Sequence, residues 1–446
     1  MLAVLLVGGG SAAVAQERGA GQDSVTVDQA VRLALDDNPA LRAARQRTKA
    51  ATAGERAARS AWFPEVGGSV QYRRLSENVD YTVDLPSGMG EQPVTFAPAI
   101  LNRYAARATV EQVLFTGLRR PNKIEAAEVH TRAAEARSDG TAQDLAFRTR
   151  AAYWRLYEAQ AQFASARRAF RQMERQLRDV QNEQEAGTAT EADVLGVRAR
   201  RDRIRVQRIQ AGNEVQAARR TLNDRMGRPL DAPLTLTDTV TVVPAPTDTT
   251  RLVQRAQSHR PDLQALRHTV QARGAEVGIA RAEWWPQVAI SGSYLYARPN
   301  EQLFPPEDQF EGSWEVGVRL SWNLSLGGRA DAATDQAQAQ RAAARYDLQD
   351  RRRAVRVEVR TQAERVAQTR QAIRAAQTSL QSAQAAYRSL QSRFEEGMIV
   401  VSDLLDAERA LREARAQLAQ AQAEYATARA ALARAVGRDV DVSPRP

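Results

Sequence analysis

The feature that most constrains this chain is an internal duplication, because a repeated sequence predicts a repeated structural unit. Residues 38–66 match residues 260–288, an offset of 222 positions (260 − 38). Further along, residues 185–195 match residues 395–405, at an offset of 210 positions (395 − 185). The shorter second offset predicts a longer polar loop in the first copy, between the two matching blocks. Each copy then reads as helix, strand, loop, strand, very long helix, turn and helix.

The duplication divides the chain into segments. The first copy spans residues 16–227 and the second spans residues 251–446. Between them, residues 228–250 are rich in Pro and Thr, which predicts a linker. Residues 1–15 have the pattern of a secretory signal peptide, because a short apolar run is followed by small residues suited to cleavage. The sequence therefore predicts an exported protein built from two similar halves.

The longest helical segments carry a heptad pattern of apolar residues, which is typical of coiled-coil packing. The seam of the first copy and its counterparts 210 positions later are Leu156, Phe163, Phe170 and Leu177, and Val366, Ile373, Leu380 and Tyr387. A helix of this size would be roughly 100 Å long at 1.5 Å per residue. A cytosolic coiled-coil scaffold would show the same heptads, so this pattern alone does not decide the function.

Between the helices lie segments in which apolar and polar residues alternate, as in strands with two different faces. The clearest are residues 288–296 and 315–324, and the weaker first-copy counterparts are residues 65–74 and 104–115. Strands of about ten residues have the length of membrane-crossing strands. Four such strands cannot close a barrel, and an open sheet edge in lipid leaves backbone groups unpaired. We therefore expect several chains to share one sheet, although a soluble hairpin packed on a helix remains an alternative.

Aromatic residues gather where the predicted helices and strands meet. Antiparallel pairing would bring these junctions to the same end of the sheet, as an interfacial girdle of aromatic residues requires. We expect five of these residues to lie at a membrane interface, namely Trp62, Phe63, Trp284, Trp285 and Trp322.

Charge and reactive groups argue against an enzyme. The net charge of +10 is spread as arginine over every predicted helix and interleaved with acids, which indicates solvated helix faces and no nucleic-acid partner. The histidines His130, His259 and His268 have no metal-ligand spacing, and there is no cysteine. A phosphate-binding glycine loop is also missing. We therefore expect no catalytic residues, no metal site and no cofactor.

Over nearly its whole mature length the sequence resembles the TolC family of outer-membrane efflux proteins. Residues 27–30 (VDQA), followed by Ala34-Leu35 and residues 38–41 (NPAL), look like the family's N-terminal helix signature. The turn at Gly187 with Asp193-Val194-Leu195, and the turn at Gly397 with Asp403-Leu404-Leu405, look like its two periplasmic tips. Each motif is modestly specific, and their duplicated order makes the combination specific.

The resemblance implies a mainly α fold with a small β part. Long coiled-coil helices would form an α-barrel, and four strands per chain would contribute to a 12-strand transmembrane β-barrel in a homotrimer. It implies an outer-membrane location with a large periplasmic portion. There the protein would be the passive export duct of a tripartite efflux or type I secretion system. The implied partners are a periplasmic adaptor protein, an inner-membrane pump or secretion ATPase, and outer-membrane lipid.

In this family the turns between the long helices close the periplasmic end of the tunnel through acidic rings and polar links. By this resemblance the residues of the pore constriction or gate are Asp193, Phe394, Ile399, Asp403 and Asp406. The tips that would dock the adaptor are Gly187, Thr188, Gly397 and Met398. Each aspartate has an alternative role, which is to stabilise the positive end of a helix dipole.

Two of these positions depart from the family pattern. Phe394 and Ile399 stand where the family prototype has a tyrosine and an arginine, which predicts a hydrophobic constriction in place of a polar latch. The sequence does not indicate which substrate is exported. The alternative function is a periplasmic coiled-coil adaptor or scaffold. Such a protein usually has a single helical hairpin and additional β-rich modules.

Overall fold

The computed structural model describes residues 24–76, 81–83, 94–97, 100–244, 248–304, 306–323, 327–396 and 398–437. The expected signal peptide at residues 1–15 and the tip residue Gly397 lie outside these ranges. The elements of the first half are β1 (Ser24–Val25), α1 (Val27–Asp37), α2 (Pro39–Ser60), β2 (Glu65–Arg74), β3 (Tyr81–Val83), β4 (Val94–Ala97), β5 (Asn102–Phe115), α3 (Arg119–Glu185) and α4 (Glu191–Arg225).

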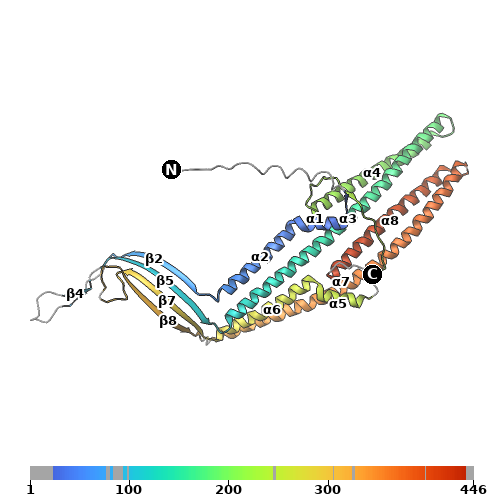
Figure 1. The fold of residues 1–446 in the computed structure, drawn as a ribbon. Helices are drawn as coiled ribbons and strands as arrows, with labels where there is room; N and C mark the ends of the chain where they lie inside the picture. Colours follow the sequence, from blue (N-terminus) through green and yellow to red (C-terminus); the bar gives the residue numbers. More distant parts are fainter. Residues whose placement is uncertain are drawn as a thin grey trace, which may run out of the picture. The chain divides into compact units, whose positions relative to one another are not determined.

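The second half repeats this order after a short strand. Its elements are β6 (Thr235–Leu236), α5 (Thr249–His259), α6 (Pro261–Arg281), a 3-10 turn (Ala282–Trp284), β7 (Gln287–Arg298), β8 (Glu311–Ser321), α7 (Arg329–Glu395) and α8 (Val401–Val436). Both α3 and α7 have 67 residues, or about 100 Å of helix. The structure confirms the expected mainly helical fold class with a small β part (Figure 1).

Local signals in the sequence account for several helix ends. Thr26 begins α1 with a capping box, in which its hydroxyl accepts a hydrogen bond from the backbone N–H of Gln29 and the Gln29 side chain accepts one from the Thr26 N–H. Pro121 lies in the first turn of α3, where its missing N–H removes no helical hydrogen bond. Gly437 ends α8 at φ +81°, the left-handed conformation that glycine adopts without steric cost.

Four strands form one antiparallel sheet in the order β2-β5-β7-β8. The central pair, β5 with β7, joins a strand of the first half to a strand of the second. Within the described residues, β2 and β8 each pair on one side only, so both edges of the sheet are open. Large apolar side chains on these edge strands are exposed, for example Val70 (87% exposed) and Val318 (69% exposed). A water-soluble sheet would normally cover such residues.

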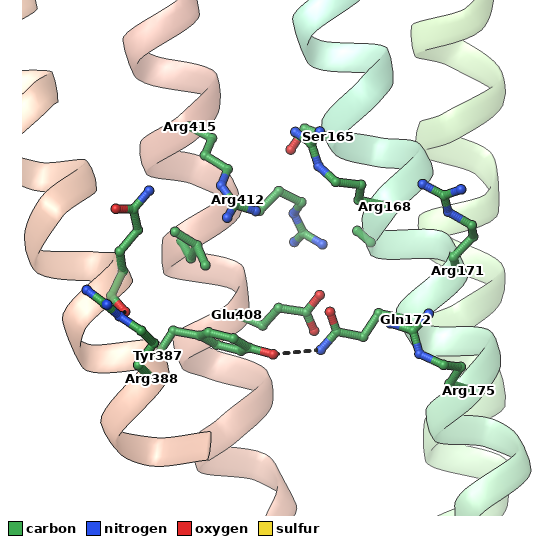
Figure 2. Close-up of a pocket in the computed structure, with 13 residues that line it drawn as sticks. Ser165, Arg168, Arg171, Gln172, Arg175, Tyr387, Arg388, Glu408, Arg412 and Arg415 are labelled. Carbon is green, nitrogen blue, oxygen red and sulfur yellow. Dashed lines mark hydrogen bonds between the residues drawn. The ribbon is translucent and has the colours of Figure 1, made fainter. Parts of the chain in front are cut away.

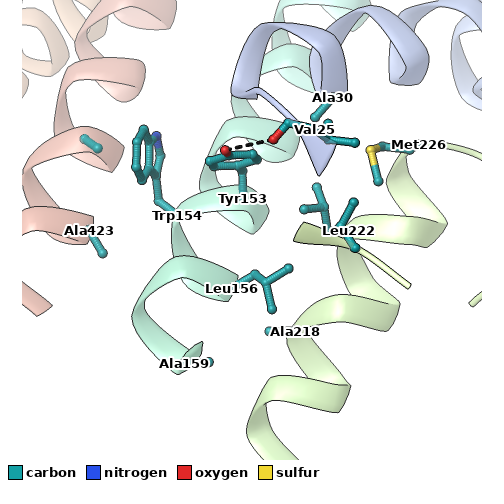
Figure 3. Packing of buried hydrophobic residues seen from close by; sticks show 12 residues of the cluster. Val25, Ala30, Tyr153, Trp154, Leu156, Ala159, Ala218, Leu222, Met226 and Ala423 are labelled. Carbon is teal, nitrogen blue, oxygen red and sulfur yellow. Dashed lines mark hydrogen bonds between the residues drawn. The ribbon is translucent and has the colours of Figure 1, made fainter. Parts of the chain in front are cut away.

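The largest buried side chains pack between helices rather than in a globular centre. Tyr153 and Leu156 of α3 pack with Leu222 of α4 and with Val25 of β1 (Figure 3). The buried Tyr153 hydroxyl donates a hydrogen bond to the carbonyl of Val25 at 3.0 Å and accepts one from the N–H of Asp238 at 3.2 Å. These bonds satisfy a polar group that would otherwise be costly to bury.

The chain divides into two compact units that cut across the repeats. One unit comprises residues 1–47, 135–265 and 348–446, and the other comprises residues 48–134 and 266–347. Each repeat contributes to both units. The first unit contains the turns between the long helices, and the second contains the four-stranded sheet.

Candidate functional site

The turn between α3 and α4 is short and closed by backbone hydrogen bonds. Gly187 has φ +80°, and the space around its α-carbon is open. The backbone N–H and the hydroxyl of Thr188 both donate to the carbonyl of Glu183, at 2.8 and 2.9 Å. These bonds satisfy the free carbonyl end of α3, and glycine supplies the left-handed backbone that the reversal needs. The predicted tip residues Gly187 and Thr188 therefore lie at the end of a helical hairpin.

The turn between α7 and α8 reverses the chain in the same way. The N–H of Met398 donates to the carbonyl of Arg393 at 2.8 Å, as that of Thr188 does to Glu183 in the first turn. Met398 and Val400 are exposed, at 61% and 64%, whereas Phe394 and Ile399 are partly buried. Exposed apolar residues at a hairpin end are candidates for contact with another protein.

Asp193 belongs to the capping box of α4. Its carboxylate accepts hydrogen bonds from the backbone N–H and the hydroxyl of Thr190, at 3.0 and 2.6 Å. In return the hydroxyl of Thr190 accepts a bond from the Asp193 N–H at 3.3 Å. These bonds from Thr190 lower the pKa of the Asp193 carboxyl. Asp193 thus performs the helix-end role that the sequence left open for it.

Asp403 and Asp406 lie in the first turns of α8, and both are exposed. No side chain caps this helix, because its N-cap residue is Val400. The Asp406 carboxylate forms an ion pair with Arg409, one turn further along α8. The buried neighbours Leu404 and Leu405 pack on the other side of the helix. The two carboxylates therefore project from one solvent-facing surface next to the turn.

The aromatic residues expected at a membrane interface lie at one end of the sheet. The register joins Glu65 with Glu111 and Gln287 with Ser321, so the strand starts and ends meet there. All five side chains are about half exposed or more, namely Trp62 (54%), Phe63 (74%), Trp284 (46%), Trp285 (58%) and Trp322 (53%). The indole N–H of Trp322 donates to the carbonyl of Trp284 at 3.2 Å. Their exposed rings meet the geometric requirement for an aromatic girdle.

Comparison with known proteins agrees with this arrangement. The family model for outer membrane efflux proteins matches residues 30–228 and 252–438. The chain belongs to the outer membrane efflux protein family.

Relatives of this efflux family cover most of the chain. The alkaline protease secretion protein AprF of Pseudomonas aeruginosa is 28% identical over 389 residues, which cover 86% of this chain and 78% of AprF. The outer membrane protein TolC of Vibrio cholerae is 24% identical over 317 residues, which cover 70% and 72% of the two chains. The TolC-family resemblance read from the sequence is confirmed.

Solved structures show the same fold. The outer-membrane channel OprN superposes with a TM-score of 0.73 at 24% identity, covering 92% of this chain and 89% of OprN. The CmeC channel of Campylobacter jejuni superposes with a TM-score of 0.77 at 16% identity, covering 93% and 87%. The chain is thus an outer-membrane efflux family protein with the fold of these channels.

Two further findings concern the described part of this efflux protein. None of its helices combines the length and hydropathy needed to cross a membrane. In the same ranges, no group of three or more His, Cys, Asp or Glu side chains is arranged to hold a metal ion.

Sequence reasoning missed a basic groove between α3, α7 and α8. We call it the arginine groove, and its volume is about 590 Å³. Six arginines and one glutamate line it, together with polar and small residues (Figure 2). The charged residues are Arg168, Arg171, Arg175, Arg388, Arg412, Arg415 and Glu408. Read singly, these arginines looked like solvated helix faces. Their spacing at three, four and seven positions on α3 and α8 is the signal that could have revealed a shared face.

Within the groove, the Gln172 side chain donates a hydrogen bond to the Tyr387 hydroxyl at 3.3 Å, which links α3 to α7. Glu408 is partly buried. Burial raises the pKa of its carboxyl, although the positive charges of Arg412, Arg175 and Arg415 act in the opposite direction. Among the described residues, Glu408 is the only carboxylate that lines the groove, and one carboxylate does not balance six arginines.

Proposed function

We propose that this chain is a subunit of a homotrimeric outer-membrane channel, the export duct of a tripartite efflux or type I secretion system. The channel would span the outer membrane and extend far into the periplasm. Substrate would pass through its lumen without chemical change, so the protein would not be an enzyme and would use no cofactor. The family and the fold of the relatives support this proposal.

The single observation that carries the proposal is the open, apolar sheet. In the part of the chain that the structure describes, the sheet has two unpaired edges, exposed valines along those edges and exposed tryptophans at one end. Unpaired backbone groups in lipid cost several kcal/mol each, so a four-stranded sheet in a membrane must pair with other copies. Three chains would supply twelve strands, which is enough for a closed barrel with an aqueous lumen.

The helical hairpins support the periplasmic part of the proposal. Helices of about 100 Å greatly exceed the thickness of a bilayer and suit a tunnel that crosses the periplasm. We propose that the tips at Gly187, Thr188, Gly397 and Met398 dock a periplasmic adaptor, which connects the duct to an inner-membrane pump or secretion ATPase. Asp403 and Asp406, repeated threefold, would form acidic rings at the constriction near Ile399 and Phe394. Asp193 would contribute less, because its carboxylate already caps α4.

The exported substrate could belong to either of two classes, secreted proteins or small molecules removed by efflux. AprF is named for the secretion of a protease, whereas other relatives are named for efflux, such as the toluene efflux pump protein TtgF of Pseudomonas putida. A passive duct does not select its cargo, so the choice would rest with the pump.

The first experiment is the mass of the full chain after detergent extraction from an outer-membrane fraction, followed by conductance in planar bilayers. We expect a three-chain particle that forms ion-conducting pores. Matched variants should carry a charge on the lipid side of the sheet, for example Val318→Arg on edge strand β8, with Thr241→Arg outside the sheet as control. A soluble monomer or dimer without conductance would refute the proposal and favour the scaffold function.

A further inference from the structure

The arginine groove has a surplus of positive charge, because six arginines and one glutamate line it. Some other arginines of the same helices pair with acids, such as Arg155 with Glu214 at 2.6 Å and Arg434 with Asp144 at 2.5 Å. Among the described residues, none of the six groove arginines forms an ion pair within 4 Å with a carboxylate. Bringing six like charges from three helices together costs free energy unless an anion offsets it.

The second copy of the repeat shows that the fold does not require the three groove arginines of α3. Arg168, Arg171 and Arg175 on α3 correspond, 210 positions later, to Thr378, Gln381 and Ala385 on α7. These are neutral residues on a helix of the same length. On the α8 side of the groove the charges also differ from those of the first copy.

That difference on α8 concerns three positions. Glu408, Arg412 and Arg415 correspond to Arg198, Asp202 and Arg205 on α4, where Asp202 forms an ion pair with Arg201 at 2.8 Å. The equivalent positions on α4 therefore carry both positive and negative charges, and the negative charge is in an ion pair with a neighbouring arginine. Of the six groove arginines, Arg388 and Arg415 have arginine counterparts in the other copy, whereas the remaining four do not. A requirement of the common fold would have acted on both copies, so these four arginines are candidates for function.

We propose that the arginine groove binds a small multivalent anion that carries carboxylate or phosphate groups. The guanidinium group presents a planar fork of N–H donors that matches both kinds of group bidentately. A volume of about 590 Å³ lies within the usual range of small-molecule sites. Arg412 reaches from α8 into the space beside α3, and the Gln172–Tyr387 pair adds neutral hydrogen-bonding groups to its wall (Figure 2). The proposal does not depend on the channel function.

The test uses the full chain in detergent, with citrate and pyrophosphate as probes in separate calorimetric titrations. The first variant carries Arg168→Thr, Arg171→Gln and Arg175→Ala, which are the residues of the sister helix and should leave the fold intact. The control removes the same charge from exposed arginines of α3 that do not line the groove, by Arg148→Gln, Arg167→Gln and Arg178→Gln. Thermal unfolding of each variant without anion checks that the fold is retained.

We expect saturable binding of at least one probe. The groove triple should weaken it by about tenfold or more, because several charge-assisted hydrogen bonds are lost. The control triple should change it by less than about twofold, since exposed distant charges are screened by salt. Glu408→Gln should tighten binding, because it removes the only opposing charge. Competition between citrate and pyrophosphate would show one shared site, whereas binding of one alone would identify the preferred group.

Three outcomes would overturn the proposal. The first is the lack of saturable binding of either probe to the native chain. The second is an equal loss of anion affinity in the groove variant and in the control variant, which would mean that surface charge alone attracts anions. The third is binding of an acidic peptide (a helix of alternating Glu and Ala) with no binding of either small anion, which would make the groove a protein-docking surface. Single variants, beginning with Arg412→Gln, extend the test if the groove triple unfolds.

Discussion

The two turns at the ends of the helical hairpins share one design but differ in how the next helix begins. In the first turn, Thr190 and Asp193 cap α4 reciprocally. In the second, Val400 stands at the position of Thr190 and has no side chain to cap α8, whereas Asp403 stands at the position of Asp193. The same aspartate is therefore engaged in one copy and has lost its capping partner in the other.

This difference shows where the two copies have been free to diverge. Heptad seams and the lengths of the long helices α3 and α7 agree between the copies because coiled-coil packing needs them. Capping residues and groove charges differ because the fold tolerates either choice. We infer that a residue without a task in the common fold is the better candidate for function. By this criterion Asp403 is a better gate candidate than Asp193, because Asp193 is hydrogen-bonded to Thr190 whereas α8 has no side-chain cap.

The largest effect should come from a position where the copies agree. Phe163→Pro removes a backbone hydrogen bond inside α3 and introduces a steric clash, at a cost of about 3 kcal/mol or more. Its counterpart Ile373→Pro in α7 should cost a similar amount. We expect both variants to yield no stable oligomer in size-exclusion chromatography with mass detection, and Phe163→Leu to assemble normally. Normal assembly of either proline variant would contradict the helix assignment and the equivalence of the copies.

The next effect concerns a buried arginine found in one copy only. Arg260 is 5% exposed, and it donates hydrogen bonds to Asp262 at 3.0 Å and to Glu358 at 2.8 Å. Its counterpart in the first copy, 222 positions earlier, is the partly buried Asn38, which accepts a hydrogen bond from the N–H of Ala40. We expect Arg260→Asn to lower the free energy of unfolding by about 3 kcal/mol, because it leaves two carboxylates without their main partner.

Chemical denaturation of Arg260→Asn should be measured beside Asn38→Ala, for which a loss of about 1 kcal/mol is expected. Equal losses would mean that the arginine network adds nothing to the common fold. The pKa of Asp262 is lowered by Arg260 and Arg351, although burial alone would raise it. Its contribution to stability should therefore be present above its unfolded pKa of about 3.9 and be lost as the pH falls below that value.

A smaller effect should follow from exchanging the caps. Thr190→Val gives α4 the start of α8 and should cost about 1 kcal/mol, and Val400→Thr should recover a similar amount for α8. Because the bonds from Thr190 lower the pKa of Asp193, their stabilisation should persist above the unfolded pKa of about 3.9 and fade as the pH falls through the lower folded pKa. Thermal unfolding at pH 7 and pH 3 would measure this. The comparison between the two turns would be wrong if Thr190→Val and Val400→Thr changed the stability of the protein in the same direction.

The gate substitutions should have the smallest effect on stability, and their effect should be measured as a change in conductance. Asp403→Ala together with Asp406→Ala should raise single-channel conductance or weaken the preference for cations, since acidic rings attract cations and are costly to close. Asp193→Ala should change selectivity less and lower helix stability instead. Unchanged conductance and selectivity in the double variant, measured in planar bilayers, would refute the acidic gate.

Much of the fold was predictable from local patterns. The alternation in residues 65–74 gave the bounds of β2, and the predicted segment 104–115 falls within β5. Heptad positions such as Leu156 and Ile373 are buried, with 0% and 1% exposure. Strands and helices can be predicted from such patterns because the side chains of each have a fixed geometric period. The reversal at Gly187 was equally predictable, since a glycine between two long helices is typical of a turn.

Other features came only from the folded chain. The arginine groove assembles side chains of α3 with side chains of α7 and α8, which lie more than 200 positions later in the sequence. Tyr153 binds the backbone at Val25 and Asp238, which no local pattern indicates. Contacts of this kind depend on the packing of distant segments, and packing is not periodic in sequence.

By itself, the sequence determined the duplication, the helical and strand periods, and the family. These are properties of neighbouring residues, because hydrophobic spacing selects helix or strand locally. Only the tertiary structure decided that the compact units cut across the repeats and that β5 pairs with β7. It also decided that one groove gathers six arginines around Glu408. The physical reason is that pairing and charge clustering arise between distant segments, and their energies depend on distance in space rather than along the chain.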